Sequence, residues 1–337
     1  MKIYKGKYGP ALIAEIGGNH EGNFEYAQKL TELAISTNVD YIKFQIYTGD
    51  TLVNPVVNPE RNKHFKKFEL TIDQYLELAQ MVKNAGIGYT ASIWSDTLLA
   101  PFIPYLDFVK IGSGDMTAYP LIEKIASYKK PIVISTGLAT EAEVIDMVNF
   151  IQSLDPVYRQ KEYLAVLQCT TMYPIKNSEA NLNVIKRFKQ LFDITVGYSD
   201  HTEGMDALKY AYAAGAEIME FHFTDSREGK QFRDHKVSLT PEEVRILQQE
   251  LLKIKELLGN ETKKPLPTEI ETGHIRSFRK AVYPAQDIPK GEIIGKEHLV
   301  ILRPNEGIDA RDYYKLIGKK TKVSLKKYQP LKFDFFE

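Results

Sequence analysis

Short apolar runs alternate with amphipathic segments along residues 11–258. The runs are rich in Ile, Val, Tyr and Phe, which is typical of parallel strands that are covered on both faces. They predict eight strands, at 11–17, 41–46, 87–93, 108–113, 131–137, 163–170, 194–199 and 218–223. Between them, apolar residues recur at helical spacing in 26–38, 72–86, 142–154, 205–215 and 241–259. Eight strand–helix units in about 250 residues predict an α/β fold, the (β/α)8 TIM barrel.

The pattern changes after residue 259, so we expect a catalytic barrel domain at 1–259. Residues 260–276 are polar and contain two prolines, which predicts a linker. Residues 277–337 hold short strand-like pieces separated by turns, which predicts a small β-rich domain that is marginal alone. Inside the barrel, the segment 47–71 is long and polar, and we expect a lid or an extra subdomain there.

Charge and composition exclude several classes of protein. Lys+Arg and Asp+Glu balance at 44 each, so no bulk charge attracts nucleic acid or a membrane surface. No apolar run approaches the roughly 18 residues of a membrane span, and no apolar signal-peptide core is visible. The single cysteine, Cys169, excludes an internal disulfide and a Cys-rich metal site. We expect a cytoplasmic protein.

Polar side chains stand near the carboxyl end of every predicted strand. Barrel enzymes carry their chemistry at those ends, so we expect these groups to meet at one mouth. In chain order they are Glu15, Lys43 with Gln45, Ser92, Lys110 with Ser113, Ser135, Thr170 and Thr171 with Tyr173, Ser199 with His201, and His222.

Two consecutive predicted strands each supply one histidine. His201 comes just after ITVGYS and His222 lies within IMEFHF, so neighbouring strands would place both at the same end of the barrel. Neutral imidazoles so placed could share a metal ion. Taken singly, His222 could be a hydrogen-bonded core residue and His201 a loop residue, but their pairing favours the metal site.

Two lysines interrupt apolar strands. Lys43 in YIKFQI and Lys110 in FVKIG are costly to bury unless they meet an anion. With nearby serine hydroxyls and the glycines of IGSG and STG, they predict a site for phosphate and carboxylate. The alternative is that each lysine points outward between helices. Glu15 could be a metal-linked carboxylate, a proton-transfer group or the partner of a lysine.

An ordered set of motifs carries a family resemblance. IAEIGGNHEG, IKFQ, KIGSGD, ISTG, CTTMYP, VGYSDHT and EFHFT occur in the order found in the sialic acid (N-acetylneuraminate) synthase family. The stretch RKAVYPAQDIPKGEIIGKEHLVILRPNEGI resembles that family's antifreeze-like SAF domain. The resemblance spans nearly the whole chain. It implies a transferase that condenses phosphoenolpyruvate (PEP) with an N-acyl-mannosamine-type aldehyde, releasing phosphate and a nine-carbon 2-keto-3-deoxy acid. A legionaminic or pseudaminic acid synthase is the alternative.

The resemblance also implies roles for individual residues. It makes His201 and His222 the ligands of a divalent metal, typically Mn²⁺, with Mg²⁺ or Co²⁺ as alternatives, and Glu15 a proton-transfer group. The implied PEP-binding residues are Lys43, Ser92, Lys110, Ser113, Ser135, Thr171 and Ser199. The implied sugar-facing residues are Gln45, Asp115, Tyr173, Asp234, which is also catalytic, and Arg303. Arg303 would come from the SAF domain of the partner subunit, which implies a domain-swapped homodimer.

Three departures from the family pattern cluster where the sugar should lie. TASIWS replaces the usual STPF and puts Ser92 in place of a threonine; GSGD replaces GSGE at Asp115; and QFRDH replaces GPDH at 231–235. The reaction class is therefore predicted and the particular sugar is not. Two other hypotheses stay open: a Schiff-base aldolase that uses Lys43 or Lys110, and a sugar- or ice-binding protein that acts through its SAF domain.

Overall fold

The computed structural model describes residues 4–337, so the first three residues of the predicted barrel domain lie outside the described residues. The chain divides into two compact units, Met1–Gly259 and Asn260–Glu337. Each unit has a hydrophobic core of its own.

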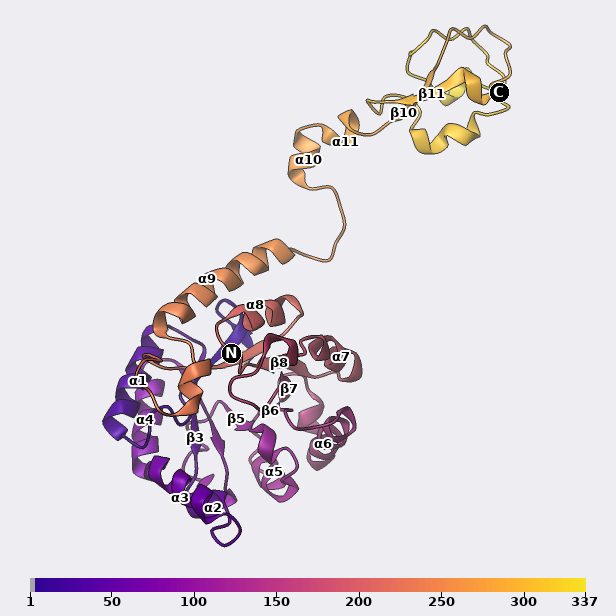
Figure 1. The fold of residues 1–337 in the computed structure, drawn as a ribbon. Helices are drawn as coiled ribbons and strands as arrows, with labels where there is room; N and C mark the ends of the chain where they lie inside the picture. Colours follow the sequence, from indigo (N-terminus) through magenta and orange to yellow (C-terminus); the bar gives the residue numbers. More distant parts are fainter. Residues whose placement is uncertain (1–3) are drawn as a thin grey trace. The chain divides into compact units, whose positions relative to one another are not determined.

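The first unit is a closed barrel of eight parallel strands, as predicted (Figure 1). Each strand pairs with the next along the chain, and the last pairs back with the first of the barrel. The strands are β2 (Gly9–Glu15), β3 (Tyr41–Ile46), β4 (Gly88–Ile93), β5 (Phe108–Ile111), β6 (Ile132–Ser135), β7 (Leu164–Cys169), β8 (Thr195–Ser199) and β9 (Ile218–His222). A short strand, β1 (Lys5–Gly6), pairs antiparallel with the start of β2.

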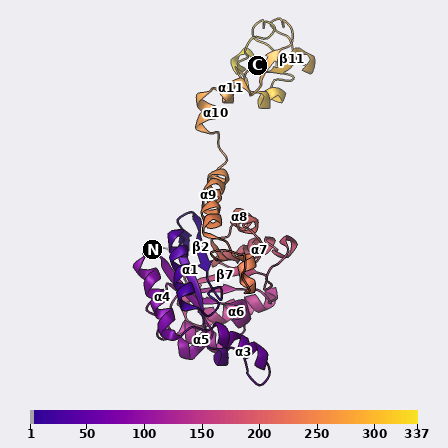
Figure 2. The same cartoon turned by 60° about the vertical axis from the view of Figure 1, so that its left-hand side comes forward.

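Helices surround the strands (Figure 2). They are α1 (Phe24–Ser36), α4 (Ile72–Asn84), α5 (Tyr119–Ala126), α6 (Glu141–Leu154), α7 (Asn183–Leu191), α8 (Asp206–Ala213) and α9 (Pro241–Leu258). All five predicted helices are present, with ends within two residues of the expected bounds. The segment 47–71 is an excursion that contains two further helices, α2 (Gly49–Leu52) and α3 (Pro59–Phe68).

The barrel interior is layered because side chains two residues apart on a strand point to the same face. Near the amino ends of the strands, the inward side chains form an apolar layer of Ala11, Ile13, Tyr41, Phe108, Val133, Ala165, Leu167 and Ile218. Two residues further along, the same strands carry Glu15, Lys43, Lys110, Ser135, Cys169 and Glu220. The polar layer therefore rests on a packed apolar floor.

The second unit contains α10 (Pro267–Glu271), α11 (His274–Ser277), and the antiparallel pair β10 (Ala281–Pro284) and β11 (Leu299–Leu302). The segment predicted as a linker is almost entirely exposed, although it holds α10 and most of α11. The strand-like piece 321–331 forms only isolated bridges, since Tyr328 takes a positive φ of 65° and Pro330 lacks an N–H to donate.

No helix among residues 4–337 is both long and apolar enough to cross a membrane.

Candidate active site

Four charged side chains meet inside the barrel. Glu15 and Lys43 form an ion pair, and both are almost fully buried. Glu220 on β9 lies between the two lysines, with Oε2 3.9 Å from Lys43 Nζ and Oε1 3.7 Å from Lys110 Nζ. Both lysines therefore point inward, and the alternative of outward-pointing lysines is wrong. Glu15 is the partner of a lysine, which was one of the roles considered for it.

The balance of charges in this layer sets the protonation of each group. Burial raises the pKa of Glu15 above its usual value, although Lys43 opposes the shift. Burial lowers the pKa of Lys110, and Glu220 opposes that shift. Burial also disfavours the charged forms of Lys43 and Glu220. The neighbouring opposite charges outweigh this effect, so the pKa of Lys43 is raised and that of Glu220 is lowered. An ionised Glu220 thus partly neutralises Lys43 and Lys110, to which an incoming anion could bind.

Serine hydroxyls from neighbouring strands contact these charges. Ser135 Oγ accepts a 2.7 Å hydrogen bond from Lys110 Nζ, and Ser92 Oγ lies 3.5 Å from Lys43 Nζ. Ser199 donates to Glu220 Oε1 at 3.1 Å. The predicted anion-binding serines of β4, β6 and β8 are therefore brought together with both lysines.

Gly137 extends the hydroxyl cluster beyond the strand ends. Its N–H donates to Ser113 Oγ at 3.0 Å. A Cβ at this position would lie 2.0 Å from Thr171 Oγ1 and 2.9 Å from Ser113 Oγ, so only glycine fits. Thr171 Oγ1 is buried without a hydrogen-bond partner among the described residues. Ser113, Gly137 and Thr171 thus form a compact cradle with unused polar capacity.

The two histidines face each other, with ring centroids 5.4 Å apart. His201 Nδ1 lies 2.7 Å from the Thr170 carbonyl oxygen, which can only accept, so this nitrogen is the donor and Nε2 keeps its lone pair. Among residues 4–337, His222 Nδ1 is buried without a hydrogen-bond partner, and the nearest carboxylate oxygen, Asp234 Oδ2, lies 3.7 Å away.

The protonation and spacing of this histidine pair fit the binding of one divalent ion. Burial lowers the pKa of His201 and, together with His201, that of His222, so both imidazoles are neutral near pH 7 and free to act as ligands. A centroid separation of 5.4 Å suits two imidazoles on one ion at metal–nitrogen distances of about 2.0–2.1 Å. Within residues 4–337, no group of three or more His, Cys, Asp or Glu gathers as a metal cage. Such an ion would keep positions open for water or substrate.

Tyr173 and Gln45, both predicted to face the sugar, contact different parts of the site. The Tyr173 ring lies 4.0 Å from that of His201 and 5.5 Å from that of His222, centroid to centroid. Gln45 stands beside Glu15, since a Cβ on Gly17 would contact Gln45 Nε2 at 3.2 Å and Glu15 Oε1 at 2.7 Å.

Asp115 and Arg303 are two further predicted sugar-facing residues. Asp115 follows β5, and burial raises its pKa to about 6 although Lys110 and Trp94 act against the shift. Arg303 is exposed in the second unit, with its guanidinium 5.3 Å from the centre of the Phe278 ring. Its role toward the sugar stays a prediction.

Glu220 is the site residue that the sequence analysis missed. It stands two residues before His222, on the same face of β9. A charged residue in an apolar strand was the signal that pointed to Lys43 and Lys110, and the same signal marks Glu220.

The molecule is thus a TIM barrel that gathers buried lysines, hydroxyls and two neutral histidines at the carboxyl ends of its strands, where barrel enzymes carry their chemistry. The chain belongs to the NeuB family, whose model matches residues 30–263, and residues 279–337 match the SAF domain.

Relatives with known names extend over almost the whole chain. The N,N'-diacetyllegionaminic acid synthase of Campylobacter jejuni is 32% identical, covering 94% of this chain and 96% of its own length. The human N-acetylneuraminate-9-phosphate synthase is 31% identical, with coverages of 93% and 89%. The crystal structure of the N-acetylneuraminic acid synthetase of Leptospira borgpetersenii, in complex with citrate, superposes with a TM-score of 0.72 at 28% identity, covering 78% of this chain and 90% of that one.

Proposed function

We propose that this protein is a PEP-dependent sugar-acid synthase. C3 of PEP attacks the aldehyde carbon of an N-acyl-mannosamine-type sugar, and the aldehyde oxygen becomes a hydroxyl. Water adds at C2, and phosphate leaves with cleavage of its C–O bond, which yields a nine-carbon 2-keto-3-deoxy acid. The observation that carries the proposal is the buried layer of Lys43, Lys110 and their hydroxyls next to the His201–His222 pair, in a chain of the NeuB family.

In this proposal the lysines and hydroxyls bind the phosphate and carboxylate of PEP. Lys43, Lys110 and the Ser113–Gly137–Thr171 cradle supply charge-assisted and neutral donors from several strands. Before PEP arrives, Glu220 favours the ionised form of both lysines. Glu15, whose pKa burial raises, is the proton-transfer group, and Asp234 orients sugar hydroxyls. A divalent ion on the histidines, most simply Mn²⁺ with Mg²⁺ or Co²⁺ as alternatives, would polarise the aldehyde oxygen as a Lewis acid.

The proposal includes a domain-swapped homodimer in which Arg303 of the partner subunit reaches the N-acyl end of the sugar. Exposed apolar side chains support a covered mouth: Leu138 after β6 is 78% exposed and Met172 after β7 is 65% exposed. A cytoplasmic location is part of the proposal because PEP is a cytoplasmic metabolite. The chain is almost equally identical to synthases of two different sugar acids, so sequence similarity does not select one acceptor sugar.

Phosphate release from PEP tests the proposed reaction. The purified full chain is incubated with PEP and Mn²⁺, and with N-acetylmannosamine, with its 2,4-diacetamido-6-deoxy counterpart, or without sugar. We expect release that requires a sugar and is lost when EDTA removes the metal. Release without any sugar, or release that EDTA leaves unchanged, contradicts the proposal.

One observation favours a Schiff-base aldolase as the second candidate. Burial lowers the pKa of Lys110, which increases the share of the free amine that such catalysis needs. Borohydride trapping with pyruvate distinguishes the two reactions. Covalent labelling of Lys110 would support the aldolase, whereas the synthase leaves the chain unlabelled.

A further inference from the structure

The segment between β9 and α9 brings an arginine to the histidine pair. The Arg233 guanidinium carbon lies 4.5 Å from the centre of the Tyr173 ring, which itself packs against both histidines. Arg233 Nε donates to Asp234 Oδ1 at 3.2 Å. Among residues 4–337, the structure gives its two terminal nitrogens no hydrogen-bond or ion-pair partner, and the side chain is 66% exposed. Arg233 thus presents unused donors beside the site.

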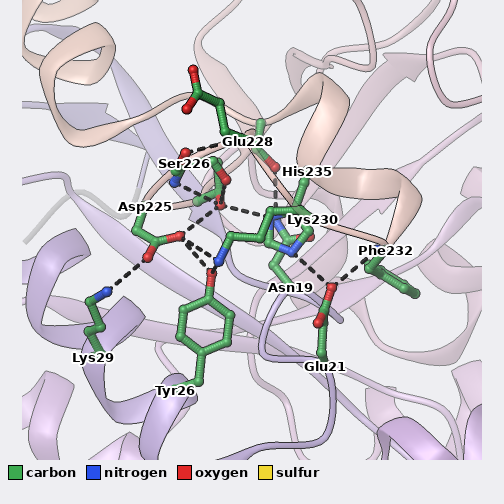
Figure 3. A network of polar contacts seen from close by, with 12 residues as sticks. Asn19, Glu21, Tyr26, Lys29, Asp225, Ser226, Glu228, Lys230, Phe232 and His235 are labelled. Atoms are coloured by element: carbon green, nitrogen blue, oxygen red, sulfur yellow. Dashed lines mark hydrogen bonds and ion pairs between the residues drawn. The ribbon is translucent and has the colours of Figure 1, made fainter.

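Contacts with α1 fix one end of this segment (Figure 3). Asp225 accepts a 2.6 Å hydrogen bond from the Tyr26 hydroxyl and pairs with Lys29 at 2.9 Å. Lys230 also contacts the Tyr26 hydroxyl and lies 3.2 Å from Asp225. These contacts join residues about 200 positions apart in the sequence, so the segment is tied to the barrel wall.

Contacts of Phe232, the neighbour of Arg233, fix a second point of the segment, and Figure 3 shows the contact with Glu21. The Phe232 N–H donates to Glu21 Oε1 at 3.1 Å, and its ring lies 5.0 Å from that of Phe68 on α3. A Cβ on Gly18 would come within 2.6 Å of the Phe232 ring, so this ring fills the space that the glycine leaves. Arg233 therefore projects from an anchored backbone, and stacking on Tyr173 limits the freedom of its side chain.

The use of charge distinguishes Arg233 from Arg227 and Lys230 of the same segment. Arg227 makes a bidentate pair with Glu243, at 2.8 and 2.5 Å, and Lys230 is engaged by Asp225 and Tyr26. Lys43 and Lys110 already face Glu15 and Glu220. Asp234 occupies only Nε of Arg233. The remaining edge of the guanidinium has the planar donor geometry that binds phosphate or carboxylate oxygens.

We propose that Arg233 is a specificity-determining residue that selects an acceptor sugar carrying an anionic group, a phosphate or a carboxylate, at the end away from its aldehyde. The inference rests on the proposed synthase reaction, because the aldehyde end is assigned to the histidine pair. It explains why a bulky Gln-Phe-Arg sequence stands where a short turn would suffice to carry Asp234: the phenylalanine anchors the segment and the arginine reads the sugar.

Three acceptors that differ only at C6 test this inference: N-acetylmannosamine, its 6-phosphate, and the corresponding 6-carboxylate. With saturating PEP and Mn²⁺, we expect kcat/KM for one charged sugar to exceed that for the neutral sugar by roughly tenfold to a hundredfold. In Arg233→Gln this ratio should fall to within about threefold of unity. Because both sugars are measured on one variant, a loss of folded enzyme cancels. Which charged sugar wins distinguishes phosphate from carboxylate.

Arg227→Gln is the matched control, since it removes an arginine of the same segment that points to Glu243, and it should keep the wild-type ratio. A wild-type enzyme that uses the neutral sugar, or a 2,4-diacetamido sugar, as well as the charged ones overturns the inference and leaves the synthase proposal standing. A ratio unchanged in Arg233→Gln overturns it equally. Absence of phosphate release with every sugar overturns the synthase reaction and the inference together.

Discussion

Glu220 and Lys110 face each other across the barrel interior, with Glu220 Oε1 3.7 Å from Lys110 Nζ. Their strands, β9 and β5, are not neighbours in the sheet, so this contact spans the lumen. A carboxylate here compensates two buried ammonium groups that would otherwise repel each other. An anionic substrate that binds the same lysines takes over part of that compensation.

Replacing Glu220 should therefore destabilise the protein most when no anion is bound. In Glu220→Gln, two buried cations lose a counter-charge, and breaking such a buried pair costs about 3–5 kcal/mol. PEP restores negative charge, so it should raise Tm more in this variant than in the wild type. Differential scanning calorimetry with and without PEP measures both effects.

Glu217→Gln is the matched control for this experiment. Glu217 lies close before β9 and pairs with Lys161 and Lys189 on the partly exposed outside of the barrel, where a pair contributes up to about 1 kcal/mol. Its Tm should change little, and PEP should stabilise it as it does the wild type. Equal stability of the two variants without PEP would show that Glu220 is not the counter-charge of the lysines.

The pKa of Asp115 predicts the acid side of the pH profile. Burial raises this pKa to about 6, so the carboxyl is ionised at pH 7.5 and gains a proton as the pH falls through 6. The ionised form is the better acceptor for sugar hydroxyls, so kcat/KM for the sugar should fall below pH 6, by about tenfold per pH unit. In Asp115→Asn this limb should disappear. The profile is measured from pH 5 to 8 at saturating PEP and metal.

Asp96→Asn is the matched change for the pH experiment, because Asp96 is an exposed residue of the neighbouring loop. This variant should keep the limb near pH 6. Titration of PEP itself is common to all three proteins and cancels in the comparison. An acid limb that persists in Asp115→Asn would assign it to another group.

Removing either histidine should remove the metal rather than the fold. We expect His222→Gln to lose Mn²⁺ on dialysis, as measured by elemental analysis, while its circular dichroism stays that of the wild type. An ion at 100 times its Kd stabilises a folded protein by about 2.7 kcal/mol, so Mn²⁺ should raise the Tm of the wild type and not that of the variant. His274→Gln, at an exposed position of α11, should bind Mn²⁺ normally. Full Mn²⁺ content in His222→Gln refutes the metal site.

The barrel was predictable because its signal is local and repeated. The spacing of apolar residues marks each strand and each helix separately, and eight consecutive strand–helix units are typical of the TIM barrel. The helix α3 escaped because its sequence PERNKHFKKF is polar almost all round, with only Asn62 and Phe68 buried. Its start was nevertheless readable: Asn58 caps it and Pro59 takes the first position.

The candidate site was predictable where burial of a charge makes a residue conspicuous. Lys43, Lys110 and the histidines follow from strand position alone. The partners of these residues could not be predicted from the sequence. Glu220 reaches Lys110 across the lumen, and the contact between Glu21 and His235 joins loops that are distant in the sequence. The same holds for the anchored Arg233, whose position depends on packing against α1, α3 and Tyr173.

Gly137 provides the most local test of the anion site. In Gly137→Ala, the new Cβ would meet Thr171 Oγ1 at 2.0 Å and Ser113 Oγ at 2.9 Å, so both hydroxyls must move out of the cradle. We expect the KM for PEP to rise by about tenfold to a hundredfold, which corresponds to the loss of one or two charge-assisted hydrogen bonds. The KM for the sugar should change by less than about threefold. Steady-state kinetics with each substrate varied in turn separates the two values.

Gly114→Ala is the control, since a Cβ on the glycine next to Ser113 meets no atom of the described residues within 4 Å. It makes the same chemical change in the loop after β5 and should leave both KM values near those of the wild type. If Gly137→Ala also leaves the KM for PEP unchanged, the Ser113–Gly137–Thr171 cradle does not hold PEP, and the anion must lie deeper, against Ser92, Ser135 and the two lysines. A rise in both KM values would instead mean that displacement of Thr171 has moved the adjoining Tyr173 and, with it, the sugar side of the mouth.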